Sequence, residues 1–311
     1  MKKLLSILIS LALILSFASC AQETATYKVG ICEYTQHSAQ SEVVKGFTDY
    51  LTEKLGDEIS FDFQNASNDS SMATTIMNTF VSNNVDLILA DNTQSLQIAA
   101  NTTFDIPVLG AAITDYNSAL GMSPDGINVS GTSDLAPLDM QADMIVELFP
   151  KVKTVGLVYC SSEVNSLYQV NLVQERLLEK GIKAVEYSFS DSNDIIFALE
   201  KACDEVEVIY LPTDNTLASC IEAVDSICRS AKIPVVTGEK AMCKGAGVAT
   251  LSIDYYSLGR KTGEMAYKVL TEGADVSNMP IQYDENAVKL YNEEICNEFG
   301  ITPPEGYLPV E

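Results

Sequence analysis

Hydroxyl, amide and carboxylate side chains follow directly after many of the short apolar runs of this chain. They are Glu33, Tyr34, Asn92, Thr93, Thr114, Asp115, Ser161, Ser162, Thr213, Asp214, Asn215, Glu239, Asp254 and Tyr255. Hydroxyls and the free backbone N–H groups of a helix start suit an anion such as a carboxylate, and acidic side chains suit a cation such as an ammonium. The set therefore predicts a site for a small zwitterion, although the same residue types also cap helices and form turns.

No motif for covalent or cofactor chemistry accompanies these residues. The chain contains no G-x-S-x-G, no G-x-x-x-x-G-K-[ST] and no G-x-G-x-x-G after an apolar run. His37, the single histidine of the chain, has no obvious nucleophile beside it and is expected to be a helix cap or a pocket-rim residue. Asp214 and Asp254 are the pair that acid–base chemistry would use, so an exported enzyme is one alternative. We expect a binding protein without catalytic residues, cofactor or bound metal.

To place such residues together at one edge of a sheet, the chain needs strands that alternate with helices. β-Branched runs occur at residues 28–33, 59–63, 85–90, 106–111, 128–130, 155–159, 184–187, 206–211, 235–237 and 248–253. Helical patterns lie near residues 39–55, 72–82, 94–101, 137–148, 164–180, 195–203, 217–231 and 258–272. Short strands separated by such helices are typical of βαβ units on a parallel sheet. In these sheets ligands bind beyond the carboxyl ends of the strands, where the polar residues fall.

The strand–helix order occurs twice, in residues 28–111 and 155–237, and this predicts an α/β fold of two doubly wound parallel-sheet lobes. The segment 112–133, rich in Gly, Ser, Asn and Asp, is the expected boundary. We predict one lobe from residues 27–113 with about 254–278, and a second lobe with the hinge crossings from about 114–253 with about 279–311. Several crossings of the chain between the two lobes would form a multi-strand hinge. A hinge between two lobes implies a cleft between them.

Composition and charge exclude several classes of function. The 311 residues include 19 Lys and Arg against 43 Asp and Glu, which gives a net charge of -24. Phosphate contacts need clustered basic residues, so nucleic-acid binding is excluded, as is docking on an anionic membrane through a basic face. A single histidine rules against His-rich metal sites.

The N-terminus has the features of an export signal. Two lysines precede an apolar run, residues 4–17, that is too short to span a bilayer. The sequence Phe-Ala-Ser-Cys at 17–20 resembles a bacterial lipobox, so we predict a signal peptide at 1–19 and a lipidated Cys20 with a tether through residue 26. The alternative is an ordinary secretory signal with an inert Cys20. The mature chain is expected on the outer face of the bacterial cytoplasmic membrane or in the periplasm, attached to the membrane only by the lipid.

Seven further cysteines follow Cys20. They are Cys32, Cys160, Cys203, Cys220, Cys228, Cys243 and Cys296. There is no C-x-x-C motif, and an odd number of thiols cannot all pair with one another. The sequence leaves open whether any of them form disulfides.

Four blocks of sequence resemble a known family. They are Asn-Val-Ser-Gly-Thr-Ser-Asp-Leu at 128–135, Ser-Ser-Glu-Val-Asn-Ser at 161–166, Pro-Thr-Asp-Asn-Thr at 212–216 and Ile-Asp-Tyr-Tyr-Ser-Leu-Gly-Arg at 253–260. In this order they are similar to the substrate-binding lipoproteins of ABC transporters of the tryptophan/tyrosine-type uptake family, across essentially the whole mature chain. The resemblance implies a type I periplasmic-binding fold whose lobes close on an aromatic amino acid (tryptophan, tyrosine or phenylalanine) without chemistry. It also implies a monomer that delivers its ligand to a membrane permease and its ATPase.

The resemblance also assigns roles by position. It places Ser161, Ser162, Asn165 and Ser166 at the ligand carboxylate, and Asp214 and Asn215 at the cleft, with Asp214 or Asp254 as partner of the ammonium. An aromatic ligand would also need a stacking surface, for which Tyr34, Tyr116 and Tyr255 are the candidates.

The sequence departs from the family pattern in the expected first lobe. His37 is followed by Ser38 where the family has Pro, and Thr114-Asp115-Tyr116 and Asn92-Thr93-Gln94 stand in place of Thr-Asp-Pro and Thr-Pro. The identity of the amino acid is therefore open. A sensor subunit of the same fold and a receptor for a sugar or nucleoside are the remaining alternatives.

Overall fold

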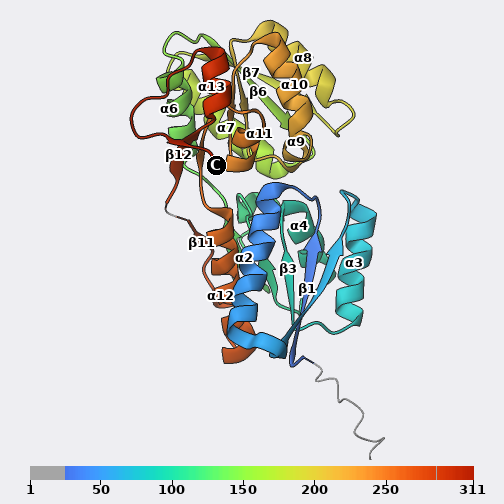
Figure 1. Cartoon of the computed structure of the whole chain (residues 1–311). Helices are drawn as coiled ribbons and strands as arrows, with labels where there is room; N and C mark the ends of the chain where they lie inside the picture. The colour runs from blue at the N-terminus through green and yellow to red at the C-terminus, as the bar shows by residue number, and fades with distance from the viewer. Residues whose placement is uncertain (1–24, 285) are drawn as a thin grey trace, which may run out of the picture.

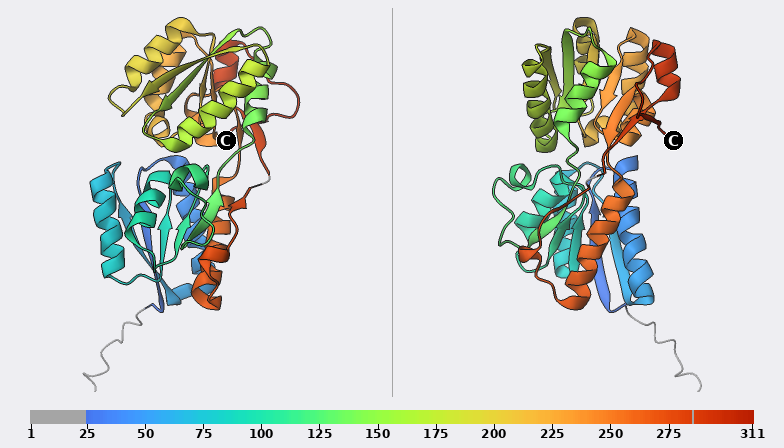
Figure 2. Two further views of the ribbon diagram at one scale, coloured as in Figure 1. Left: turned by 180° about the vertical axis from the view of Figure 1, so that it is seen from behind. Right: turned by 90° about the vertical axis from the view of Figure 1, so that its left-hand side faces the viewer.

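The computed structural model describes residues 25–284 and 286–311, which form two α/β lobes stacked end to end (Figure 1). The predicted signal peptide and Cys20 lie outside the described residues. In each lobe helices cover a central sheet (Figure 2). Within the described ranges, no helix combines the length and the apolar character that a membrane span requires.

The first lobe is built on a parallel sheet with the strand order β11-β5-β4-β3-β1-β2. Its strands are β1 (Tyr27–Glu33), β2 (Ile59–Asn65), β3 (Leu87–Ala90), β4 (Val108–Gly110), β5 (Val129–Ser133) and β11 (Gln282–Tyr283). Its helices are α2 (Ser38–Leu55), α3 (Ser70–Ser82), α4 (Thr93–Thr102), α5 (Tyr116–Leu120) and α12 (Tyr255–Glu272), with short 3-10 helices η1 (Gly56–Glu58) and η2 (Val276–Asn278). Strand β3 is buried along its whole length, as expected for a strand covered on both faces.

The second lobe has the strand order β13-β12-β10-β9-β8-β6-β7, in which only the β10–β12 pair is antiparallel among the described strands. Its strands are β6 (Thr154–Cys160), β7 (Lys183–Phe189), β8 (Val208–Leu211), β9 (Val235–Thr237), β10 (Ala249–Ser252), β12 (Val288–Tyr291) and β13 (Leu308–Pro309). Its helices are α6 (Leu138–Leu148), α7 (Val164–Glu179), α8 (Ile195–Glu205), α9 (Asn215–Ser219), α10 (Ile221–Ala231), α11 (Lys240–Ala246) and α13 (Glu293–Phe299). The prediction of an α/β fold with two parallel-dominated sheets is confirmed.

The boundary expected within residues 112–133 lies further along the chain. Both α5 and β5 belong to the first lobe, because β5 pairs in parallel with β4. Residues 282–283 also belong there, because β11 pairs with β5. Glycines contributed to the prediction of a boundary in this segment. Gly131, however, has a φ of 141°, and a Cβ there would lie 1.9 Å from the carbonyl oxygen of Gly110. The glycine therefore serves close strand packing, and not a flexible connection.

The chain crosses between the lobes after β5, after β10 and after β11. After the second crossing, α12 packs along α2 in the first lobe (Figure 1). A Cβ at Gly259 would lie 2.0 Å from the carbonyl oxygen of Val43, and a Cβ at Gly46 would lie 2.1 Å from that of Tyr256. Glycine at both positions lets the two helix backbones touch and fixes the end of this crossing to the first lobe.

Candidate functional site

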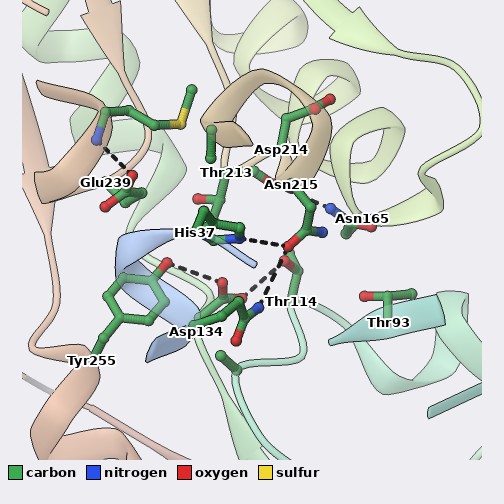
Figure 3. A pocket seen from close by; sticks show the side chains of 14 residues that line it. His37, Thr93, Thr114, Asp134, Asn165, Thr213, Asp214, Asn215, Glu239 and Tyr255 are labelled. Atoms are coloured by element: carbon green, nitrogen blue, oxygen red, sulfur yellow. Dashed lines mark hydrogen bonds between the residues drawn. The ribbon is translucent and has the colours of Figure 1, made fainter. Parts of the chain in front are cut away.

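A narrow buried cavity lies between the two lobes and is lined by residues of both (Figure 3). The first lobe and the crossings contribute His37, Gln40, Thr93, Ala112, Thr114, Asp134 and Tyr255. The second lobe contributes Asn165, Thr213, Asp214, Asn215, Ala218, Glu239 and Met242. Most of these residues follow the carboxyl ends of strands or begin the next helix, so both sheets direct their strand ends at the cavity.

The wall of the cavity in the second lobe is held by a buried carboxylate behind it. Glu163 accepts hydrogen bonds from the backbone N–H (3.0 Å) and side-chain Nδ2 (2.7 Å) of Asn215. It also accepts from the backbone N–H (2.8 Å) and hydroxyl (2.7 Å) of Thr216. These bonds occupy both oxygens of Glu163 and fix the start of α9.

Both oxygens of Asp214 also accept hydrogen bonds from within the second lobe. One oxygen accepts from the backbone N–H of Leu217 at 2.8 Å, which caps α9, and the other accepts from that of Cys160 at 2.7 Å. Burial, and then the charge of Glu163, raise the pKa of Asp214 well above its usual range. Asp214 therefore lines the cavity while its oxygens hold the loop together.

Two further acidic residues face the cavity. Asp134 accepts hydrogen bonds from the hydroxyls of Thr114 (2.9 Å) and Tyr255 (3.1 Å), and burial raises its pKa to about 6. Glu239 caps α11 by accepting from the backbone N–H groups of Ala241 (2.5 Å) and Met242 (2.6 Å), and burial raises its pKa to about 7. None of the cavity-lining residues that the structure describes is Lys or Arg, so the cavity favours a cationic group.

Hydrogen bonds also join the two lobes directly across the cavity. Asn215 Oδ1 accepts from His37 Nε2 (3.0 Å) and from Gln40 Nε2 (3.4 Å), because its Nδ2 is committed to Glu163. Burial lowers the pKa of His37, so the ring is neutral with its proton on Nε2. His37 Nδ1, Gln40 Oε1 and Asn165 Oδ1 are then buried acceptors without a partner among the described residues. Such atoms in a cavity indicate a ligand that donates hydrogen bonds.

The opposite end of the cavity suits an anion. Thr93 is the first residue of α4, behind a capping box formed by Asn92 and Ser95. The first backbone N–H groups of a helix have no partner within the helix and carry its positive end. Ala112 lines the same cavity with φ 56°, a left-handed conformation that costs a non-glycine residue about 1–3 kcal/mol.

The structure brings eight of the predicted site residues to the cavity: Thr93, Thr114, Asn165, Thr213, Asp214, Asn215, Glu239 and Tyr255. The other predicted residues make contacts elsewhere in their own lobes. They are Glu33, Tyr34, Asn92, Asp115, Ser161, Ser162, Ser166 and Asp254.

Their hydrogen bonds explain these positions. Glu33 accepts from Asn65 Nδ2 (2.7 Å), and the hydroxyl of Tyr34 bonds with that of Ser70 (2.8 Å). Asn92, Asp115 and Asp254 cap α4, α5 and α12, and Ser166 is fully buried beside Asn165. Ser161 and Ser162 donate to the carbonyl oxygens of Phe189 (2.9 Å) and Ser190 (3.1 Å). Tyr116, a candidate stacking surface, is buried in the first lobe and donates to Gly110 O (2.9 Å).

Sequence reasoning missed Gln40, Ala112, Asp134, Ala218 and Met242, and it gave His37 only a place at the rim. Asp134 carried a detectable signal, because it follows β5 directly once that strand is extended to Ser133. Gln40 lies inside the first turn of α2, where residue type and spacing give no comparable signal.

Comparison with known proteins agrees with this architecture. The family model for ABC transporter substrate binding proteins matches residues 28–309. The chain is 35% identical over 272 residues to a tyrosine-binding protein of Clostridioides difficile (strain R20291), covering 86% of this chain and 79% of that protein.

Two solved structures are also similar. An ABC domain from Streptococcus pneumoniae in complex with L-Trp has a TM-score of 0.86 and 33% identity, covering 91% of this chain and 100% of the other. A ligand-free, open substrate binding protein with adhesive properties from Clostridium difficile has a TM-score of 0.69 and 36% identity, covering 92% and 100%.

This chain superposes better on the L-Trp complex than on the open structure, although its identity to the two is similar. The hydrogen bonds between His37, Gln40 and Asn215 agree that its lobes are closed on each other. The chain belongs to the ABC transporter substrate-binding protein family and has the type I periplasmic-binding fold.

Proposed function

We propose that this protein captures a free aromatic amino acid between its lobes and delivers it, unaltered, to an ABC permease. The observation that carries the proposal is one buried cavity that has both acidic side chains and an anion-binding helix start in its wall. Asp134 and Glu239 supply the first, and the start of α4 with Thr93 supplies the second. In Figure 3, Thr93 and Glu239 lie on opposite sides of the labelled residues, and Asp134 is drawn between them.

Asp134 is the proposed partner of the ligand's ammonium group. Its oxygens accept hydrogen bonds from the rotatable hydroxyls of Thr114 and Tyr255, and each oxygen has capacity for a further donor. Asp214 is less suited, because its oxygens accept backbone N–H groups of the loop. A buried ammonium costs several kcal/mol unless a charged and hydrogen-bonded partner offsets that cost, and Asp134 is such a partner.

The start of α4 is the proposed site for the ligand's carboxylate. Thr93, the first residue of this helix, lines the cavity, and so does Ala112 with its strained backbone. This assignment replaces Ser161 and Ser162, whose hydroxyls are used within their own lobe.

The aromatic class rests on the relatives and on the remaining lining residues. One relative is a tyrosine-binding protein and another was solved with L-Trp. Tyr255, Met242 and Ala218 offer apolar surface to a ligand side chain. The unpartnered acceptors on His37, Gln40 and Asn165 would accept hydrogen bonds from the ammonium or from a hydroxyl or indole N–H.

Closure of the lobes connects capture to delivery. A ligand that contacts both lobes favours the closed arrangement in proportion to those contacts. In the closed arrangement Asn215 already meets His37 and Gln40, and Gln169 Nε2 donates to Thr114 Oγ1 at 3.5 Å. The closed surface is the one we expect the permease to recognise.

Attachment to the membrane through Cys20 belongs to the same proposal. Substrate-binding proteins work outside the cytoplasmic membrane, and residues 1–20 have the pattern of a lipoprotein signal. Mass spectrometry of the mature N-terminus, isolated from a bacterial membrane fraction, tests it. We expect a diacylglyceryl group on Cys20, and an unmodified N-terminus in the soluble fraction would contradict lipid anchoring.

Isothermal titration with tyrosine, tryptophan, phenylalanine, apolar amino acids, sugars and nucleosides tests the ligand class. We expect an aromatic amino acid to bind and to be recovered chemically unchanged. At 100 times its dissociation constant it should raise the free energy of unfolding by about 2.7 kcal/mol. Binding confined to sugars or nucleosides, or consumption of the ligand, would contradict the proposal.

A further inference from the structure

We propose that Cys203 and Cys228 form a disulfide that joins α8 to α10 in the exported protein. Their sulfur atoms are hydrogen-bonded at 3.9 Å, from two helices that pack against each other. A disulfide needs the sulfurs at about 2 Å, so the two sulfurs must approach each other by about 2 Å to form the bond. In the described part of the chain no other two cysteine sulfurs are joined in this way.

The remaining described cysteines have other neighbours. Cys160 is bonded to the hydroxyl of Ser162 (3.0 Å) and Cys220 to that of Ser219 (3.7 Å). Cys243 and Cys296 donate to the carbonyl oxygens of Gly247 (3.7 Å) and Val248 (3.2 Å). These thiols pack as small groups in the fold. Among the described cysteines, Cys203 and Cys228 are the pair whose sulfur atoms are hydrogen-bonded to each other.

The two thiols differ in a way that suits stepwise oxidation. Cys203 is half-buried, and the hydrogen bond with Cys228 lowers its pKa. Cys228 is 2% exposed, and both the hydrogen bond and burial raise its pKa. Cys203 is therefore the accessible nucleophile and Cys228 the resolving thiol.

The balanced reaction uses a small-molecule disulfide as oxidant. The Cys203 thiolate attacks one sulfur of that disulfide, forms a mixed disulfide and releases one thiolate. The Cys228 thiol loses its proton and attacks Cys203 Sγ, which forms the internal bond and releases the second thiolate. Two protein thiols are oxidised and one small disulfide is reduced to two thiols. Extracytoplasmic compartments allow such bonds to persist.

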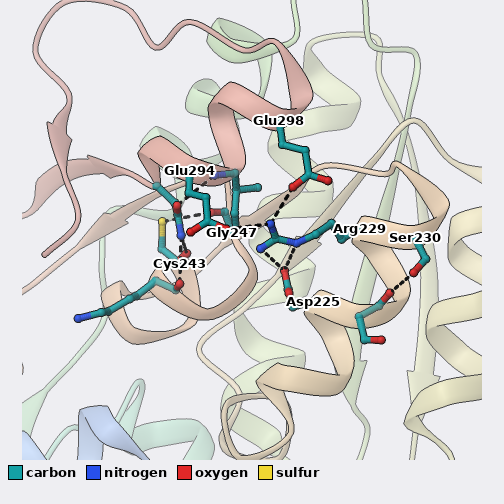
Figure 4. A network of polar contacts seen from close by, with 11 residues as sticks. Asp225, Arg229, Ser230, Cys243, Gly247, Glu294 and Glu298 are labelled. Atoms are coloured by element: carbon teal, nitrogen blue, oxygen red, sulfur yellow. Dashed lines mark hydrogen bonds and ion pairs between the residues drawn. The ribbon is translucent and has the colours of Figure 1, made fainter.

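The bond would enclose the segment of the second lobe that lines the cavity. Residues 204–227 contain β8 and α9, and with them Thr213, Asp214 and Asn215. Helix α10 is anchored independently by Arg229, which pairs with Asp225, with Glu298 at 2.8 Å and with Glu294 at 3.3 Å (Figure 4). The disulfide would fix α8 to α10, and in the unfolded chain it would restrict the segment 204–227.

Peptide mapping of the full chain tests the inference. The protein is incubated with oxidised glutathione or with dithiothreitol, alkylated, and cleaved after Asp and Glu, which places Cys203, Cys220 and Cys228 in separate peptides. We expect the Cys203 and Cys228 peptides to be linked only after oxidation, with a Tm roughly 5–10 °C above that of the reduced protein. No linked peptide under excess oxidant, or a link to Cys220, would overturn the inference.

Two variants separate this bond from a general effect of oxidation. Cys203→Ser should lose both the linked peptide and the oxidant-dependent rise in Tm. Cys220→Ser removes a half-buried thiol of the same region and should keep both. If Cys203→Ser retains the full rise in Tm, the rise has another origin and the inference fails.

Discussion

The two walls of the cavity hold their polar side chains in different ways. In the second lobe, Glu163 and Asp214 accept hydrogen bonds from backbone N–H groups, which fix both carboxylates in place. In the first lobe, His37 and Gln40 have acceptors without a partner in the described part of the chain, and Asp134 accepts from the hydroxyls of two side chains. Asn165 departs from the pattern of its wall, because its Oδ1 has no partner among the described residues.

Because of this difference, the wall in the second lobe is preorganised, and the wall in the first lobe recognises the ligand. A wall whose carboxylates are bonded to backbone N–H groups keeps one shape whether or not a ligand is present, because these buried donors already have their acceptors. Unpartnered acceptors gain their partner only when a ligand arrives, and rotatable hydroxyls can reorient toward it. Substitutions in the second wall should therefore reduce stability first, and substitutions in the first wall should reduce affinity with little change in stability.

The largest effect is expected from Glu163→Ala. The substitution leaves the buried backbone N–H groups of Asn215 and Thr216 without acceptors, and each such group costs about 1–3 kcal/mol. We expect the free energy of unfolding to fall by about 4 kcal/mol, measured by urea denaturation. Glu175→Ala, at an exposed position of the same helix, should change it by no more than about 0.5 kcal/mol. A loss below about 1 kcal/mol for Glu163→Ala would show that the wall is held by other contacts.

Asp134→Asn should weaken amino-acid binding roughly 100-fold, a loss of about 3 kcal/mol, because the ammonium loses its charged partner. The fold should be retained, since an amide can still bond with the hydroxyls of Thr114 and Tyr255. Calorimetric titration measures the change. Asp254→Asn is the matched control, because Asp254 caps α12 at an exposed position and asparagine caps equally well. Equal losses in both variants would refute the assignment of the ammonium to Asp134.

Thr93→Val should weaken binding roughly tenfold, because the ligand carboxylate loses one hydroxyl donor while the N–H groups of α4 remain. The melting temperature should not change, since valine has nearly the same shape. Thr102→Val is the control at the other end of α4, where the threonine hydroxyl donates to Ile98 O at 2.7 Å. It should bind like the unmodified protein. Unchanged affinity in Thr93→Val would place the carboxylate elsewhere in the cavity.

Most of the fold was predictable because its strands are apolar runs between helices of suitable length. Strand β5 shows where this reasoning fails. The sequence predicted a strand at 128–130, but the strand extends through Thr132 and Ser133, which are polar. Thr132 Oγ1 is bonded to Thr262 Oγ1 (2.8 Å), and Ser133 donates to Thr114 O (2.9 Å). Tertiary partners satisfy these buried hydroxyls, and local polarity cannot reveal such partners.

The site was predictable to the extent that it follows strand ends. The rule found Thr93 and Asp214, but it also selected Asp115 and Asp254, whose carboxylates cap helices outside the cavity. A capping carboxylate and a ligand-facing carboxylate have the same sequence context, and only the surrounding elements distinguish them. The predicted strand at 128–130 ended too early, so Asp134 was not recognised as a residue that follows a strand end. The geometry favours this residue for the ammonium.

Affinity should also depend on pH, with an effect similar to that of Thr93→Val. In the empty cavity burial raises the pKa of Asp134 to about 6 and that of Glu239 to about 7, so both gain protons as the pH falls from about 8 to 5.5. An ammonium beside them favours the ionised carboxylates and lowers both pKa values. Binding therefore releases protons, and we expect affinity to fall by about tenfold over this range.

Calorimetry in two buffers of different ionisation enthalpy measures the released protons directly. Glu239→Gln should remove the part of the pH dependence near pH 7 and keep the part near pH 6, because Asp134 remains. Asp254→Asn should keep the whole profile. A histidine would not explain the part of the profile near pH 7, since burial lowers the pKa of His37 from its usual value. An affinity that is constant from pH 8 to 5.5 would mean that neither carboxyl meets the ligand's ammonium, and the contrast between the two walls would then rest on the uncharged acceptors alone.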